Sequence, residues 1–135
     1  MRFSIYLTIL LLIASCKSKE EKFLINGNND MWRVVQQGQH RIDSSLEFFK
    51  FNSDNTFDEI YFLDNKFKKM DSNPDILNWH KWQQVSDSIF KIAHIEFRVI
   101  TLMDSFAQFG NIKRQQDTLT LLRKKILKGS FTSYP

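Results

Sequence analysis

Apolar and polar residues alternate with a period of two along much of the chain. The clearest case is residues 94–103, where Ile95, Phe97, Val99 and Met103 occupy alternate positions. Successive side chains of a strand point to opposite faces of a sheet. The alternation therefore predicts one long strand with an apolar face.

Shorter runs of the same kind predict the other strands. They cover residues 31–37, 46–52, 57–63, 79–85, 88–93, 106–109 and 118–122. Ser53-Asp54-Asn55-Thr56 supplies turn residues between two of these runs and predicts a hairpin. Pro74 follows Asn73 and predicts a short helix over 74–78, because proline suits the first helical position.

The segment 117–128 allows two interpretations. Thr118-Leu119-Thr120-Leu121 alternates with period two and favours a strand. A helix that ends before Gly129, with lysines in its last turn, is the alternative. With the strand, the pattern predicts an all-β domain over 27–128 and a tail over 129–135. We expect an antiparallel meander of about 7–8 strands that closes on itself or forms a sandwich, because either arrangement removes exposed edges.

The first sixteen residues follow a different pattern. Arg2 precedes an apolar run, and the small residues Ala14 and Ser15 stand before Cys16, the only cysteine of the chain. A run of about 12 residues forms a helix of about 18 Å, whereas the hydrocarbon core of a bilayer is about 30 Å thick. The pattern therefore predicts an export signal over residues 1–15 rather than a transmembrane helix.

Ile13-Ala14-Ser15-Cys16 resembles the lipobox of bacterial lipoproteins. In that family the cysteine thiol receives a diacylglycerol, the signal is cleaved before the cysteine, and the new amino group is often acylated. The resemblance implies cleavage between Ser15 and Cys16 and a membrane anchor of several acyl chains on Cys16. A secretory leader followed by a chance cysteine is the alternative, although an isolated thiol is unusual in an exported protein.

The residues after the cysteine predict a tether. Residues 17–22 (Lys-Ser-Lys-Glu-Glu-Lys) contain no apolar side chain, so we expect a mobile segment that extends to residue 26. The residue that follows Cys16 is Lys17, whereas an aspartate there would resemble an inner-membrane retention signal. The resemblance to lipoproteins thus implies delivery to the outer membrane, with the periplasmic or surface side left open.

Composition narrows the classes of function. The chain has 19 basic and 15 acidic residues, which are interspersed, so nothing indicates a nucleic-acid partner. A lipidated Cys16 leaves no thiol for a disulfide, a metal or nucleophilic catalysis. The 13 phenylalanines and three tryptophans supply enough aromatic volume for a large core or for an aromatic-lined cavity.

Three motifs together resemble the lipocalin-like lipoproteins of Bacteroidetes. They are Gly27 followed by Trp32, an aromatic strand that runs through an Asp-Asn-Thr turn from Phe49 to Phe57, and Trp82 with Asp87-Ser88-Ile89 and the closing Asp117-Thr118-Leu119-Thr120-Leu121. The resemblance covers about residues 27 to 124. It implies a small, partly open up-and-down barrel whose interior holds a hydrophobic ligand, and it implies no activity.

Aromatic and charged side chains on the predicted strands are the candidates to line such a pocket. We expect rings to contact the ligand and charged groups to fix its polar end. The candidates are Trp79, Trp82, Phe51, Tyr61, Phe90, Phe97, His94, Glu96 and Arg98. Aromatic residues on strands also form ordinary core. A packed barrel that docks an envelope protein is therefore the alternative.

No motif for catalysis, a metal or a cofactor accompanies these residues. His94-Ile95-Glu96 matches only the first half of a zinc-deaminase signature, because the Pro-Cys-x-x-Cys partner is missing. His40, His80 and His94 are too scattered to predict a metal site. Residues 54–59 are rich in oxygen donors but lack the glycine and distal glutamate of a calcium loop. The sequence therefore predicts a non-enzymatic binding protein without a cofactor or metal.

Overall fold

The computed structural model describes residues 17–27, 29–41, 46–70 and 80–126. Within these ranges one short helix precedes ten strands, which belong to a single antiparallel sheet. The elements are α2 (Lys19–Leu24), β1 (Asp30–Gly38), β2 (His40–Arg41), β3 (Glu47–Phe51), β4 (Phe57–Leu63), β5 (Lys66–Lys69), β6 (Trp82–Ser86), β7 (Ile89–Ile92), β8 (Ile95–Leu102), β9 (Phe106–Asn111) and β10 (Thr118–Lys125). The predicted all-β fold is confirmed.

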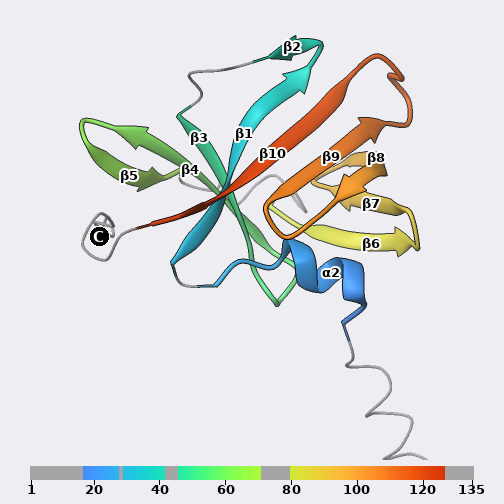
Figure 1. Cartoon of the computed structure of the whole chain (residues 1–135), viewed down its shortest axis with the longest axis horizontal. Coiled ribbons are helices and arrows are strands. Elements are labelled where there is room, and N and C mark those ends of the chain that lie inside the picture. Colours follow the sequence, from blue (N-terminus) through green and yellow to red (C-terminus); the bar gives the residue numbers. More distant parts are fainter. Residues whose placement is uncertain (1–16, 28, 42–45, 71–79, 127–135) are drawn as a thin grey trace, which may run out of the picture.

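Within β3–β5 and within β6–β10, each strand pairs with the next one along the chain, and β1 joins these two groups. Their order in the sheet is β5-β4-β3-β1-β10-β9-β8-β7-β6, and the two-residue β2 also pairs with β1. Strand β1 therefore binds both β3 and the last strand, β10 (Figure 1). The sheet curls into a half-barrel with β5 and β6 at its edges, as expected for a partly open barrel.

Local irregularities curl the sheet. The pairing register shifts between Val34 and Gln36 of β1, between Gln84 and Ser86 of β6, and between Val99 and Thr101 of β8. Such bulges bend a strand and increase its twist. The residues before β6 are thereby brought to the tip of the β3–β4 hairpin, where Thr56 and Lys81 form an isolated bridge.

Hydrogen bonds hold this junction on both sides of the bridge. The amide of Phe57 donates to the carbonyl of His80 at 2.8 Å, and the amide of Trp82 donates to the carbonyl of Asn55 at 2.9 Å. The hairpin tip follows the predicted turn, with Asn55 at φ 68° and the Asp54 carboxylate accepting from the amide of Thr56 at 3.0 Å.

The concave face of the sheet carries the main core. Alternate residues of each strand point inward, as the period of two predicts. The buried cluster consists of Leu24, Trp32, Val34, Phe49, Phe51, Phe57, Trp82, Phe90, Ile92, Phe97, Ala107, Phe109, Leu119 and Leu121. A second, smaller cluster contains Met31, Phe48 and Ile60, with Phe62, Phe67 and Ile126 packed against it. We call it the outer cluster, because its residues alternate with those of the main core along β1, β3 and β4.

Several predicted boundaries were close and others were wrong. Within the segment 117–128, residues Thr118–Lys125 form strand β10, so the helical alternative is wrong. Strand β6 begins at Trp82, three residues later than predicted, because residues 80–82 pair with the hairpin tip instead. Strand β5 was not predicted, since Lys66-Phe67-Lys68-Lys69 has a single apolar residue. Its turn is made by Asp64 and Asn65, both with positive φ.

The N-terminal segment differs from the predicted mobile tether. Residues 19–24 form helix α2, and a capping box between Ser18 and Glu21 starts it. Leu24 is fully buried in the main core, and the indole of Trp32 donates a hydrogen bond to its carbonyl at 2.8 Å. The apolar residues after the charged run explain the difference, because Leu24 draws the whole segment onto the barrel. Order therefore begins before Gly27.

Some predictions concern residues outside the described ranges. These are the export signal over 1–15, Cys16, the helix over 74–78, Trp79 and the tail over 129–135.

Candidate functional site

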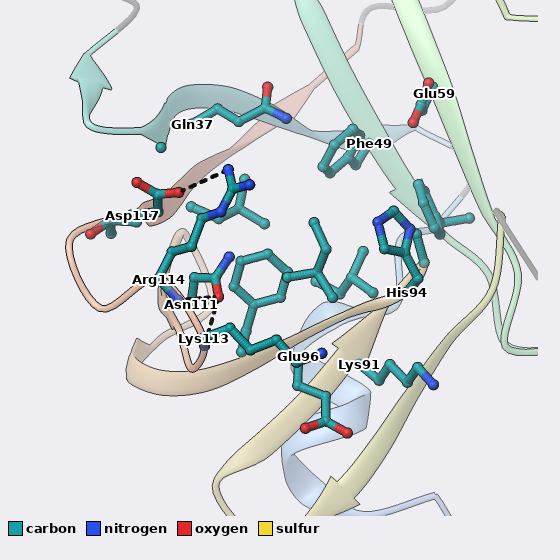
Figure 2. A pocket seen from close by; sticks show the side chains of 18 residues that line it. Gln37, Phe49, Glu59, Lys91, His94, Glu96, Asn111, Lys113, Arg114 and Asp117 are labelled. Carbon is teal, nitrogen blue, oxygen red and sulfur yellow. Dashed lines mark hydrogen bonds and ion pairs between the residues drawn. The ribbon is translucent and has the colours of Figure 1, made fainter.

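A cavity of about 680 Å³ opens on the concave side of the sheet. It lies between β4, the β7–β8 turn and the loop from β9 to β10 (Figure 2). This volume falls within the range of about 300–1,000 Å³ that is typical of small-molecule sites. We call it the large cavity. Its apolar wall is formed by Phe49, Phe57, Ile92, Ile95, Phe97 and Leu119.

The loop from β9 to β10 forms one rim of the large cavity. The side-chain oxygen of Asn111 accepts hydrogen bonds from the amides of Lys113 and Arg114 at 2.9 and 3.0 Å. The guanidinium of Arg114 lies 3.9 Å from the carboxylate of Asp117 (Figure 2). Gly38 ends β1 beside this loop with φ 69°, a conformation that favours glycine. This rim is therefore a hydrogen-bonded turn that carries two basic side chains, Lys113 and Arg114.

The turn from β7 to β8 forms the opposite rim. Ala93 has φ 54°, and its amide donates to the carbonyl of Lys81 at 2.8 Å. Lys91 and Glu96 pair across the two strands, and their side chains extend away from the cavity (Figure 2). The imidazole of His94 instead lies on the cavity side, near Phe49. Of these polar groups, only His94 is placed to meet a ligand.

Acidic groups border the cavity on the β3–β4 side. Glu59 lines it, while Glu47 and Tyr61 face each other across β3 and β4. Burial and then the charge of Glu59 raise the pKa of Glu47, although a hydrogen bond with Tyr61 opposes that shift. Burial, Glu47 and Glu59 together raise the pKa of Tyr61 to about 12. The ionised forms of Glu47 and Tyr61 are thus both disfavoured at this wall.

A second cavity of about 490 Å³ lies beside the first. We call it the small cavity, lined by Asp54, Asn55, Lys81, Trp82, Gln83, Lys91, Ala93 and His94. Lys91, Ala93 and His94 also line the large cavity. Hydrogen bonds from Thr56 hold the pKa of Asp54 below its ordinary value. An anionic group therefore persists at this rim even in mildly acidic solution.

The structure distributes the predicted pocket residues over several environments. Phe97, His94 and Glu96 line the large cavity, although the carboxylate of Glu96 points away from it. Tyr61 lies at the acidic group described above, and Arg98 is exposed on the opposite face of β8 from Phe97. Trp79 lies outside the described residues.

Three of the predicted aromatic residues form packed core. Phe51, Trp82 and Phe90 are buried, and the ring of Trp82 contacts those of Phe51 and Phe90 at centroid distances of 5.6 and 6.3 Å. The indole nitrogen of Trp82 donates to the carbonyls of Asn52 and Thr56 at 3.2 and 3.0 Å. Trp82 also borders the small cavity.

Sequence reasoning missed most of the cavity lining. Phe49 and Phe57 were assigned only to the hairpin, although their strand positions place them on the inner face. The rim residues Asn111, Lys113 and Arg114 come from a loop whose conformation no periodicity reveals. In the described part of the chain, no group of three or more His, Cys, Asp or Glu side chains is placed to hold a metal ion.

No protein-family model matches the chain, and no curated protein matches it. Among the described residues, no helix is both long and apolar enough to cross a membrane. The functional argument therefore rests on the fold, on the cavity and on residues 13–16 of the sequence.

Proposed function

We propose that the chain is a bacterial envelope lipoprotein, anchored through Cys16, whose lipocalin-like domain binds a small apolar ligand in the large cavity. The role is non-catalytic, and the outer membrane is its location. The observation that carries the ligand part is a cavity of about 680 Å³ whose inner wall is phenylalanine and aliphatic side chain. The residues Ile13-Ala14-Ser15-Cys16 carry the anchor part.

The wall and rim indicate the chemistry of the ligand. Phe49, Phe57 and Phe97 line the apolar wall but expose less than a tenth of their own surface, and Ile95 beside them is partly exposed. His94 and the loop with Lys113 and Arg114 lie at the rims, where they can meet a polar end. We therefore propose an amphiphile with a small polar group rather than a pure hydrocarbon.

The anchor is tested by labelling the full chain with an alkyne-bearing palmitate in a bacterial host. We expect label on the wild-type protein and none on Cys16→Ser. The intact mass should correspond to a chain that starts at residue 16 and carries acyl groups. An unlabelled wild-type chain that retains residues 1–15 would contradict the anchor.

Ligand binding is tested on the full chain in phosphatidylcholine nanodiscs with a diazirine-bearing fatty acid as the probe. We expect photoadducts in peptides that contain Phe49, Phe57 or Phe97. Ile95→Trp places a larger ring at the cavity wall and should reduce these adducts severalfold. Ile100→Trp is the matched control, because Ile100 is exposed on the same strand. Equal labelling of both variants, or no adduct at the cavity, would overturn the proposal.

One observation favours docking of an envelope protein as a second candidate function. Leu46 is 50% exposed beside the outer cluster, and its carbonyl accepts a hydrogen bond from the amide of Phe62 at 2.8 Å. Leu46→Glu would abolish co-purification of a stoichiometric partner while leaving the adducts at the large cavity unchanged. Lys66→Glu, an exposed charge change on the neighbouring hairpin, is the control for this test.

A further inference from the structure

Lys17 and Ser18, just before helix α2, contact the wall of the barrel. The ammonium of Lys17 donates a hydrogen bond to the side-chain oxygen of Asn55, and it lies 5.5 Å from the centroid of the Trp82 ring. The hydroxyl of Ser18 donates to the side-chain oxygen of Gln84. Asn55 and Trp82 both line the small cavity, so Lys17 lies at its rim.

The residues that follow form a short helix that is held against the barrel at both ends. The capping box of Ser18 and Glu21 fixes the first turn of α2. At the other end, Leu24 is fully buried, and the guanidinium of Arg123 donates to the carbonyl of Phe23. Residues 17–24 are therefore a packed strap, a name we use for this segment below.

A packed strap and a flexible tether predict different distances from the anchor. Lys17 directly follows Cys16 in the sequence, and consecutive Cα atoms are about 3.8 Å apart, so a single peptide unit links the anchor residue to the contacts of Lys17. A flexible chain of about ten residues, as expected for residues 17–26, would instead have an end-to-end distance of about 17 Å and no fixed direction. With the strap docked, an anchor on the residue before Lys17 would be joined to the barrel at the rim of the small cavity.

We propose that the strap holds the barrel directly on the bilayer, with the rim of the small cavity facing the phospholipid headgroups. The proposal rests on lipidation of Cys16, which belongs to the proposed function. Lys91, Ala93 and His94 line both cavities. The ligand of the large cavity is therefore drawn from the leaflet that carries the anchor, past the β7–β8 turn.

The test measures which side of the barrel is near the lipid. Cys16 is acylated, so a cysteine introduced elsewhere is the only free thiol and takes a fluorophore. Gln83→Cys places the fluorophore at the rim of the small cavity, and Lys66→Cys places it on β5, on the opposite side of the molecule from α2 (Figure 1). The full chain is reconstituted in phosphatidylcholine vesicles that contain nitroxide-headgroup lipid. We expect severalfold stronger quenching at position 83 than at position 66.

A spacer variant separates the strap from the anchor without altering the barrel. A Gly-Ser insertion of about 12 residues between Cys16 and Lys17 adds an end-to-end distance of about 20 Å. We expect it to remove the difference in quenching between the two positions.

The intact mass of each sample is measured first, so that the two proposals fail separately. A chain without acyl groups would contradict the anchor itself. An acylated chain with equal quenching at both positions, or with a difference that the spacer leaves unchanged, would overturn the strap proposal alone.

Discussion

The two halves of the barrel interior place phenylalanine rings in different surroundings: one half is packed, and the other borders the large cavity. Phe90 and Phe97 face each other across β7 and β8, yet Phe90 is fully buried between Trp82 and Phe109 while Phe97 borders the large cavity. The packed half is closed by the strap and by the tip of the β3–β4 hairpin. The other half is bordered by the β7–β8 turn and the loop from β9 to β10, and no segment covers the cavity between them in the described part of the chain. Both rings belong to the buried main core and both contact Phe109, so what lies on the remaining side of a ring decides whether it also borders a cavity.

The sharpest test of this contrast replaces each ring with alanine. Phe90→Ala should lower the free energy of unfolding by about 3–5 kcal/mol, because it leaves a void in a packed cluster. Phe97→Ala should cost at least about 1 kcal/mol less, since open volume already lies on one side of its ring. Chemical denaturation of the full chain in detergent micelles measures both. Equal losses would mean that the two halves are packed alike.

Leu24 tests whether the strap belongs to the packed half. Leu24→Ala should lower the free energy of unfolding by about 2–4 kcal/mol, because the side chain is fully buried in the main core. Lys22→Ala changes an exposed residue of the same helix and should be neutral within about 0.5 kcal/mol. If both variants unfold at the same denaturant concentration as the wild type, the segment is a tether after all.

Arg123 joins the strap to the sheet. Its guanidinium lies 3.1 Å from the carboxylate of Asp30 and 4.6 Å from the centroid of the Trp32 ring. Both partners of the ion pair are largely shielded from solvent. Arg123→Leu should therefore lower the free energy of unfolding by about 1–3 kcal/mol, as expected for a buried charge left without its partner. Arg114→Leu removes an exposed guanidinium near Asp117 and should have a much smaller effect.

The smallest expected change in the free energy of unfolding comes from Glu47, which lies on β3 beside the large cavity. Its pKa is raised in the folded protein, so the folded state binds this proton more tightly than the unfolded state does. Stability is therefore greatest below the unfolded pKa of glutamate and decreases as the pH rises through the unfolded and then the folded value. Glu47→Gln should flatten that slope and raise the free energy of unfolding at neutral pH by roughly a few tenths of a kcal/mol. Unfolding curves across acidic and neutral pH measure it, and unchanged slopes would contradict the shift.

The sequence predicted the fold better than the site, for physical reasons. Alternation is a local property, so strands such as β8 and the hairpin around Asn55 were visible from single segments. The strap was missed because Leu24 gains its burial from residues far along the chain. Lys66-Phe67-Lys68-Lys69 was missed because an edge strand needs only one apolar face, which a single Phe67 supplies.

The cavity could not be predicted at all from alternation. Phe97 was identified as lining, but so were Phe51 and Phe90, which have the same pattern and are packed core. The volume arises from the curl of the sheet and from the loop fixed by Asn111, and both depend on backbone geometry. A pattern predicts which face a ring points to, and it does not predict whether another ring meets it there.

The position of β1 between β3 and β10 also sets the order in which the molecule can assemble. Strand β1 is made early in synthesis, but its longest pairing partner ends at Lys125. Contacts between such distant segments form slowly, because a long loop must close first. The contacts of Arg123 with the Asp30 carboxylate and with the carbonyl of Phe23 in the strap likewise form only after β10 has been made. The two groups of strands that pair locally, β3–β5 and β6–β9, can therefore form first, and the sheet becomes one only when the last strand, β10, pairs with both β9 and β1.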